Sequence, residues 1–381
     1  MNPVYAALPT TIFEEVSALA RASGAINLGQ GFPDEEGPED VRRAAAEALM
    51  TRSNQYPPML GLPELRDAIA DHYRRLQGLD VSAAEVMVTS GATEAIADAL
   101  LALITPGDEV VLIAPMYDAY LPMVLRAGGV PRFVTLRPPQ WRLTAEAVEA
   151  AITPRTRLIV LNNPVNPAAR VFTREELTEL ADICVRHDLI AVCDEVWEHV
   201  IFDRRVHIPL ITLPGMRERT VKIGSAGKIF SMTGWKVGWT IAAPRLHAQL
   251  ARAHQFNTFT TCPALQIGVA HGLAKEEVEF AAMRARYQRA RDRFASAIAA
   301  GGYAVAPSEG TYFLTVDLPA SGIAEPDAAF CRRIVTEVGV AAIPISAFYA
   351  EEPVSSVIRL CFAERDETLD EGARRLIAAR R

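Results

Sequence analysis

The chain has 381 residues, of which 50% are hydrophobic and 22% charged, so it can bury a sizeable core and is neither a disordered chain nor a small disulfide-stapled module. It carries 39 Lys and Arg residues against 46 Asp and Glu, which gives a formal net charge of -7. Proteins that bind phosphate backbones or anionic membranes carry the opposite, basic excess. We therefore expect neither nucleic acid nor a membrane as a partner.

The five cysteines are widely spaced and form no C-x-x-C pair, which argues against a disulfide framework and a zinc knuckle. The seven histidines form no H-x-x-x-H pair, and no metal site is expected. No apolar run approaches the roughly 18 residues of a membrane span, and the first residues lack the basic and apolar regions of an export signal. These features predict reduced thiols and a cytoplasmic location.

Lysine is rare, because only four of the 39 basic residues are lysines: Lys222, Lys228, Lys236 and Lys275. Arginine cannot lose its proton at working pH whereas lysine can, so a site that needs a nucleophilic amine has to keep its lysine. Three of the four lie between residues 222 and 236. This stretch is the first candidate for a catalytic site.

Short apolar runs alternate with helical patterns through the middle of the chain. The predicted strands, in chain order, are Val86–Thr89, Glu109–Ile113, Pro131–Thr135, Leu158–Leu161, Leu189–Cys193, Val221–Gly224 and Val237–Ile241. Helices such as 95–104 and 173–187 separate them, which indicates a largely parallel sheet with helices on both faces. Because such sheets bind ligands beyond the carboxyl ends of their strands, we expect the functional residues to lie just after these apolar runs.

After about residue 262 the pattern changes to a long helix over 276–299 and then an α+β segment. That segment has predicted strands over 313–317 and 357–362, with a helix over 328–338 between them. We expect residues 1–46 to form an N-terminal arm and part of a small domain, 47–278 a large domain, and 279–381 the rest of the small domain. The predicted fold class is α/β, with a smaller α+β domain formed by both chain ends.

Three polar motifs come directly after predicted strands. The segment 90–94, SGATE, leads into a helix whose free N–H groups and dipole attract an anion. The segment 162–167, NNPVNP, has two prolines that stiffen a turn and orient Asn166. Asp194 places a carboxylate at another strand end. Each motif alone is more often a capped helix or an ordinary turn.

A fourth motif, SAGK over 225–228, puts Lys228 at the exit of a strand, where burial would favour the neutral amine that attacks a carbonyl. A nucleotide P-loop is excluded, because its pattern requires Gly at the position of Lys222 and Ser or Thr at the position of Ile229. The segment 29–31, GQG, likewise lacks the third glycine of a dinucleotide-binding turn. A different phosphate-bearing ligand is needed.

Together the strand ends supply an anion cradle, an amide, an acid and a lysine. Pyridoxal 5′-phosphate uses all four: the amine forms a Schiff base, the acid pairs with the pyridine nitrogen, and the helix N-terminus holds the phosphate. The sequence therefore predicts this cofactor.

The sequence resembles the class I and II aminotransferases of pyridoxal-phosphate fold type I, from about Ile26 to the C-terminus. The resemblance is carried by the segments INLGQGFPDEEGP, NQYPPMLGLPELR, DEVWEH, SAGKIFSMTGWKVGW and IRLCFA. These segments are most similar to the kynurenine, glutamine and methionine aminotransferase subgroup. The resemblance implies a mostly parallel seven-stranded sheet in the large domain and a homodimer with shared active sites.

The resemblance also implies roles for the matching residues. Lys228 is the expected Schiff-base lysine and Asp194 the expected partner of the pyridine nitrogen, and both are expected to be catalytic. The other expected cofactor-binding residues contact the phosphate, the ring face or the 3-oxygen of the ring. The expected phosphate ligands are Gly91, Ala92, Thr93, Ser225, Lys236 and the neighbouring subunit's Tyr56. Tyr117 is expected to stack on the ring face, and Asn166 and Trp197 are expected to bind the 3-oxygen. The expected substrate-binding residues are Gly31, Asn166, Phe13 and Arg359, whose guanidinium would grip the α-carboxylate.

Trp197 departs from the family pattern, because this position usually holds a tyrosine whose hydroxyl binds the 3-oxygen of the ring. Indole has one N–H donor and no acceptor, so Trp197 can replace that hydrogen bond only if its larger ring fits. The departure affects the protonation of the Schiff base rather than the identity of the cofactor.

The sequence thus predicts an aminotransferase that moves an amino group from an L-amino acid, such as methionine, glutamine or an aromatic amino acid, to a 2-oxo acid by a ping-pong mechanism. The same residues would serve a carbon–sulfur β-lyase acting on cysteine S-conjugates, which expels a β-leaving group instead. A non-catalytic regulator on this fold is disfavoured, because such regulators carry an extra DNA-binding domain and only about thirty residues precede the first family motif.

Overall fold

A seven-stranded sheet forms the centre of the larger part of the molecule in this computed structural model, which describes residues 2–380. Its strands are β2 (Val86–Thr89), β3 (Glu109–Ala114), β4 (Val130–Thr135), β5 (Thr156–Asn162), β6 (Ile190–Asp194), β7 (Thr220–Ser225) and β8 (Gly238–Ala242). They lie in the order β2-β8-β7-β6-β5-β3-β4, and only β8 runs antiparallel to its neighbours. The predicted mostly parallel α/β fold is confirmed, and each predicted strand is present with ends within two residues.

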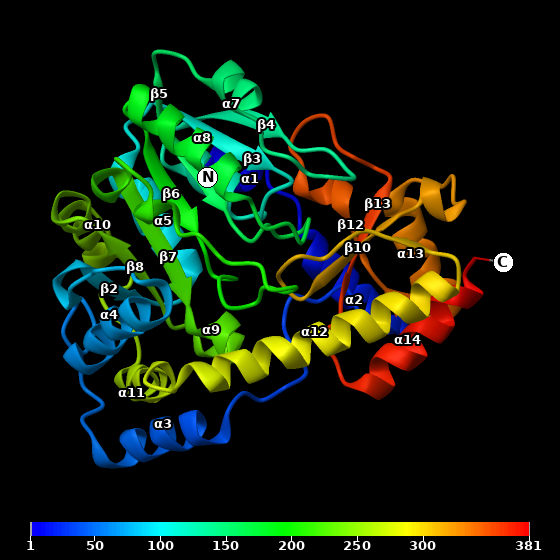
Figure 1. Cartoon of the computed structure of the whole chain (residues 1–381), viewed down its shortest axis with the longest axis horizontal. Coiled ribbons are helices and arrows are strands. Elements are labelled where there is room, and N and C mark those ends of the chain that lie inside the picture. Colours follow the sequence, from blue (N-terminus) through cyan, green and yellow to red (C-terminus); the bar gives the residue numbers. More distant parts are fainter. Residues whose placement is uncertain (1, 381) are drawn as a thin grey trace.

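Helices cover both faces of this sheet (Figure 1). The α-helices of the whole described chain, including α13 and α14 beside the smaller sheet, are α1 (Pro3–Ala6), α2 (Ile12–Ser23), α3 (Glu39–Thr51), α4 (Pro63–Gln77), α5 (Ala92–Leu103), α6 (Tyr120–Arg126), α7 (Ala145–Ala151), α8 (Arg174–Arg186), α9 (Ala226–Ile229), α10 (Pro244–Asn257), α11 (Pro263–Leu273), α12 (Glu277–Ala300), α13 (Asp327–Val338) and α14 (Asp366–Ala378). Alternate residues of β3 enter two separate hydrophobic cores, Val110 and Leu112 in one and Val111 and Ile113 in the other. This alternation explains why the strands read as continuous apolar runs. No helix in residues 2–380 has the length and apolar character needed to cross a membrane.

A smaller antiparallel sheet lies on the other side of the molecule, in the order β12-β13-β10-β9. Its strands are β9 (Ala304–Val305), β10 (Phe313–Asp317), β12 (Ile343–Pro344) and β13 (Val357–Cys361). A short parallel pair joins the two ends of the chain here, because β1 (Ile26–Asn27) pairs with β11 (Val340–Ala341). The long helix α12 runs from the large sheet to the small one (Figure 1).

The exact division into domains stays a prediction. The boundary expected at residue 46 falls inside α3, which packs on α11: a Cβ added to Gly268 would lie 2.8 Å from the Cβ of Ala45. The boundary expected at residue 278 falls in the first turn of α12. Both boundaries therefore lie within continuous helices.

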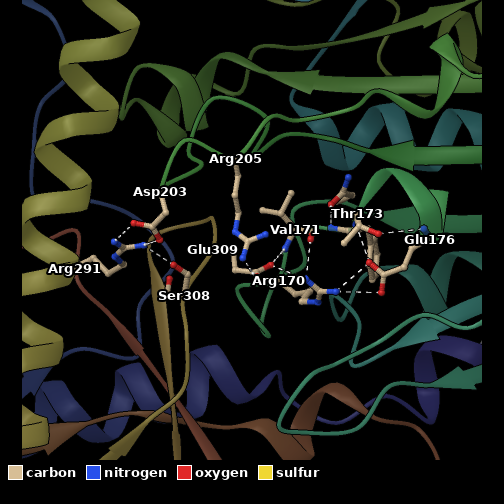
Figure 2. Close-up of polar contacts among 11 residues, drawn as sticks. Arg170, Val171, Thr173, Glu176, Asp203, Arg205, Arg291, Ser308 and Glu309 are labelled. Atoms are coloured by element: carbon tan, nitrogen blue, oxygen red, sulfur yellow. Dashed lines mark hydrogen bonds and ion pairs between the residues drawn. The ribbon is translucent and has the colours of Figure 1, made fainter. Parts of the chain in front are cut away.

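A partly buried ionic cluster fastens the small sheet to the loops that leave β5 and β6 (Figure 2). Glu309, which precedes β10, accepts hydrogen bonds from Arg170 at 2.9 Å and from the Val171 N–H at 2.9 Å, and it pairs with Arg205 at 2.7 Å. The backbone adds further bonds, including Glu309 N–H to the Ala169 carbonyl at 2.7 Å and Phe202 N–H to the Glu309 carbonyl at 3.0 Å. The loop between β9 and β10 is thus held against both strand exits.

Replacement of Glu309 with alanine should lower the free energy of unfolding by about 1–3 kcal/mol, because the Val171 N–H loses its acceptor and Arg170 keeps only Glu176 of its two carboxylate partners. Urea unfolding followed by circular dichroism measures the change. Glu309→Gln is the matched control and should lose less, since the amide oxygen still accepts one bond. A change below about 0.5 kcal/mol in Glu309→Ala would show that the cluster contributes nothing beyond an ordinary surface contact.

Candidate active site

Lys228 lies in the one-turn helix α9, directly after β7, with its amine at the edge of a cavity. Its Nζ donates to the Gly31 carbonyl at 3.2 Å and to the Tyr312 hydroxyl at 3.3 Å. Burial lowers the pKa of Lys228, and although Asp194 opposes this, Arg359 adds to it and the pKa reaches about 8. A neutral, nucleophilic amine is therefore far more accessible here than on a free lysine.

Asp194 ends β6 and is buried within the same cavity. Its Oδ2 accepts from the Tyr120 hydroxyl at 2.5 Å, and its Oδ1 from the Val196 N–H at 3.4 Å. Burial raises the pKa of Asp194 in spite of the Tyr120 hydrogen bond and the nearby Lys228. A carboxylate in this position has a strong tendency to pair with a cationic group brought into the cavity.

The turn between β2 and α5 forms an anion cradle. Gly91 has a φ of +83°, a region that side chains rarely adopt, and a Cβ there would lie 3.1 Å from the Lys236 amine. The first N–H groups of α5, at Ala92 and Thr93, have no partner within the helix and open into the cavity. Lys236 and Ser225 line the same cavity, so it offers backbone donors, a hydroxyl and an amine to an anion.

Asn162, the last residue of β5, and Asn166, in the turn that follows, both line the cavity. The Asn162 Oδ1 accepts from the Asn166 N–H at 2.7 Å, and the Asn162 Nδ2 donates to the Asp194 carbonyl at 3.0 Å. One amide therefore fixes both the turn that carries Asn166 and the strand end that carries Asp194. Asn166 in turn accepts from Arg359 through its Oδ1 at 2.9 Å.

Arg359 is fully buried in β13 of the small sheet. Besides Asn166 it donates to the Gly29 carbonyl at 2.7 Å, while its Nε has no partner among the described residues. Its guanidinium carbon lies 3.8 Å from the centre of the Phe313 ring and 5.2 Å from that of Phe13. Burial lowers the pKa of Arg359 to about 10. Within residues 2–380 no ion pair includes this cation, so its charge has no carboxylate partner in the described chain.

Trp197 packs beside Lys228 and is 2% exposed. The Lys228 Nζ lies 4.7 Å from the centre of the indole ring, and Tyr312 meets that ring edge-on at 4.4 Å between centroids. The larger ring therefore fits this position. The Tyr312 hydroxyl also donates to the Gly31 carbonyl at 2.6 Å, so Gly31 is held within reach of the amine.

Most of the residues expected from the sequence are brought together in one cavity of about 180 Å³. Its lining includes Gly91, Ala92, Thr93, Tyr117, Asn166, Asp194, Trp197, Ser225, Lys228 and Lys236. Arg359, Gly31 and Phe13 are connected to this set by the contacts described above. Tyr56 is not part of it: the side chain is 84% exposed and contacts Phe259. Its expected role at a neighbouring subunit's phosphate stays a prediction.

Three residues of the site were missed by sequence reasoning: Tyr120, Asn162 and Tyr312. Tyr120 stands three residues after Tyr117, and their ring centroids are 5.7 Å apart. The three-residue spacing of these tyrosines in APMYDAY is the sequence pattern that indicates that Tyr120 lies near the site. Asn162 was the first amide of NNPVNP. Tyr312 approaches from the small sheet, and no local pattern places it beside Lys228.

The cavity suits the predicted cofactor. A phosphate fits the cradle of Gly91, Ser225, Lys236 and the α5 N-terminus, a pyridine nitrogen fits the buried carboxylate of Asp194, and an aldehyde fits the amine of Lys228. Hydrogen-bond donors therefore face the phosphate position, an anion faces the ring-nitrogen position, and an amine faces the aldehyde position.

Comparisons with known proteins agree with this chemistry. The family model "Aminotransferase class I and II" matches residues 23–376. The probable N-succinyldiaminopimelate aminotransferase DapC of Mycobacterium tuberculosis is 44% identical, with 96% of this chain and 95% of the relative covered. The methionine aminotransferase of Escherichia coli is 40% identical, with 97% and 96% covered, and the human kynurenine–oxoglutarate transaminase 1 is 34% identical, with 93% and 92% covered.

The fold agrees as well. The solved structure of N-succinyldiaminopimelate aminotransferase from Mycobacterium tuberculosis superposes with a TM-score of 0.97 at 44% identity and covers all of both chains. The expected likeness to methionine and kynurenine aminotransferases is confirmed, whereas the sequence motifs did not suggest DapC. The chain therefore belongs to the class I and II aminotransferases, which use pyridoxal 5′-phosphate as their cofactor.

Proposed function

We propose that this aminotransferase takes its amino group from an L-amino acid with an uncharged side chain, such as methionine, glutamine or an aromatic amino acid, and passes it to a 2-oxo acid. The observation that carries the proposal is the surroundings of Arg359: one buried guanidinium bordered by Phe13, Phe313 and Phe348. That cation suits the α-carboxylate common to all these substrates. The aromatic rings beside it suit an apolar or aromatic side chain.

Each residue of the site has a task in this reaction. Bound pyridoxal phosphate supplies an aldehyde for the amine and an aromatic ring that accepts electrons. Lys228 would take up the proton from the substrate's α-carbon and give it up to the 4′-carbon of the cofactor, for which its lowered pKa of about 8 suits it near neutral pH. Asp194, supported by Tyr120, keeps a negative charge beside the ring nitrogen. Asn166 and Arg359, which are already hydrogen-bonded to each other, orient ring and substrate.

A second candidate substrate is N-succinyldiaminopimelate, which appears in the name of a relative that is 44% identical. That molecule carries carboxylates beyond the one held by Arg359. The cations described at the cavity of one chain are Lys228, Lys236 and Arg359, and each already has a proposed task. We therefore rank the uncharged amino acids first.

A homodimer is part of the proposal. Tyr56 and Met50 are more than four-fifths exposed, as is Phe256, which is unusual for large apolar side chains. Contact with a second chain would cover them and would bring Tyr56 to the partner's cradle. Cysteine S-conjugate β-lyase activity remains the alternative reaction, since it needs the same residues.

A panel of amino donors with a single 2-oxo acid tests the substrate. Methionine, glutamine, phenylalanine and kynurenine should each exceed aspartate in kcat/KM by roughly tenfold or more, because a second carboxylate would lie unpaired among aromatic rings. Pyruvate release from a cysteine S-conjugate, measured in the same series, reports the lyase. The substrate proposal fails if N-succinyldiaminopimelate or aspartate is the best donor.

The pKa of Lys228 predicts how the cofactor-free protein couples to pyridoxal phosphate. Only the neutral amine attacks, so the coupling rate should rise with pH and level off above a midpoint near 8, instead of near the 10.5 of a free lysine. Stopped-flow absorbance measures the rate. Lys228→Met is the control and should form no adduct that borohydride can fix, and peptide mapping of the wild type should find the fixed adduct on Lys228. A midpoint above about 10 would contradict the effect of burial.

Trp197→Phe should raise the pH midpoint of the bound cofactor's visible absorption by on the order of one unit. The expected cause is loss of the indole N–H donor to the ring's 3-oxygen, which makes that oxygen more basic and strengthens its hold on the neighbouring proton. Trp197→Tyr restores a donor and is the matched control, with a midpoint close to the wild-type value. If Trp197→Phe titrates like the wild type, the indole serves only for packing.

A further inference from the structure

Lys222 is the lysine of the 222–236 stretch that the proposed reaction does not use, and it is completely buried in β7. It lies on the face of the sheet turned away from the cavity. Its Nζ is 4.8 Å from the centre of the Tyr73 ring, and the neighbouring Gly224 on the same face touches Tyr73 and Trp239. A buried ammonium of this kind is costly and needs partners that repay the loss of water.

Two carboxylates bind the Lys222 ammonium, and both come from the segment that follows Asp194. Lys222 donates to Glu195 and, at 2.6 Å, to Glu198. Glu195 comes directly after Asp194, and Glu198 directly after Trp197. The segment therefore turns two side chains into the cavity and two onto the same ammonium behind the sheet.

Further hydrogen bonds satisfy these carboxylates, which are almost fully buried. Glu198 accepts from the Tyr73 hydroxyl at 2.5 Å and from Gln77 at 2.6 Å. Glu195 accepts from the Leu210 N–H at 3.1 Å, and His207 lies 3.0 Å from it. We call Lys222, Glu195, Glu198, Tyr73 and His207 the rear cluster.

Lys222 and Glu198 keep their charges across the ordinary pH range. Burial acts to raise the pKa of Glu198, but the Lys222 ammonium and other nearby cationic groups outweigh it and lower that pKa to about 2. Burial acts to lower the pKa of Lys222, yet Glu195 and Glu198 outweigh it and raise that pKa. Glu195, Glu198 and His207 also have the spacing of metal ligands, but the ammonium already binds both carboxylates.

We propose that Lys222 is a positioning residue for Asp194 and Trp197, holding the two carboxylates between them so that both side chains face the cofactor. The backbone of the segment agrees: Glu195 N–H bonds the Ile223 carbonyl at 3.1 Å, and Val200 N–H bonds the Trp197 carbonyl at 2.8 Å. Without the ammonium, two buried carboxylates repel each other and draw in water, and the turn loses its fixed geometry. The inference rests on the cofactor-binding roles proposed above for Asp194 and Trp197.

Lys222→Met tests the proposal, because methionine has a similar length and no charge. In the cofactor-free protein, amide hydrogen exchange over residues 195–200 should become more than about tenfold faster, while exchange in α5 stays unchanged. In the loaded enzyme, the pH midpoint of the visible absorption should move, and kcat should fall on the order of 10- to 100-fold with little change in KM. The exchange measurement does not depend on catalysis, and the donor panel tests the proposed substrate separately.

Glu109→Gln is the matched control, since Glu109 is a buried, ion-paired carboxylate at the opposite, amino end of β3. This variant should be less stable than the wild type. Its hydrogen exchange over residues 195–200, the pH midpoint of its visible absorption and its kcat should all stay unchanged. If Lys222→Met does not fold, the triple variant with Glu195→Gln and Glu198→Gln is measured in its place. It has no carboxylate repulsion, so its changes come from the lost ammonium hydrogen bonds alone and should be smaller but in the same direction. A folded variant with a wild-type midpoint and kcat would overturn the proposal, whether or not the segment exchanges faster.

Discussion

The parallel pairing of β5, β6 and β7 is the constraint on which the site depends. Its register sets Asn162 opposite Asp194 and Asp194 opposite Ile223. Successive side chains of a strand point to opposite faces, so a slip by one residue would turn Glu195 into the cavity and Asp194 away from it. Two neighbouring acids thus acquire different surroundings from their position in the sheet alone.

Lys222, Lys228 and Arg359 differ in the number of carboxylates that pair with them, and this difference determines what each can do chemically. Lys222 has two carboxylates, which raise its pKa and keep it charged. Lys228 has no carboxylate within ion-pair distance among the described residues, so burial lowers its pKa to about 8 although Asp194 opposes the shift. Arg359 has an amide and a carbonyl in place of an acid. The first is suited to hold structure, the second to exchange a proton, and the third to receive an anion.

The sequence was sufficient to predict the sheet, because its strands are continuous apolar runs with turn residues at their ends. It was also sufficient to bring Lys228, Asp194, Asn166 and the residues of the α5 turn to one place, since each follows a strand of one sheet. Tyr120 and Asn162 act on those residues through side-chain contacts: the spacing in APMYDAY indicates that Tyr120 lies near Tyr117 but does not predict its hydrogen bond to Asp194. Tyr312 reaches Lys228 from the residue before β10, and Tyr56 does not line the cavity of its own chain, so these placements depend on packing that the sequence pattern does not express.

The scarcity of lysine has a consequence for chemical handling of the molecule. Lys222 is sealed behind the sheet, Lys228 and Lys236 border the cavity, and the Lys275 side chain is 18% exposed and paired with Asp40. Reagents that attack lysine amines therefore find few targets outside the active site. A bound cofactor would cover Lys228 and Lys236, the two lysines that border the cavity. Immobilisation or cross-linking of the cofactor-free protein through lysine would therefore act on the catalytic centre, whereas the abundant arginines and carboxylates on the surface offer attachment that spares it.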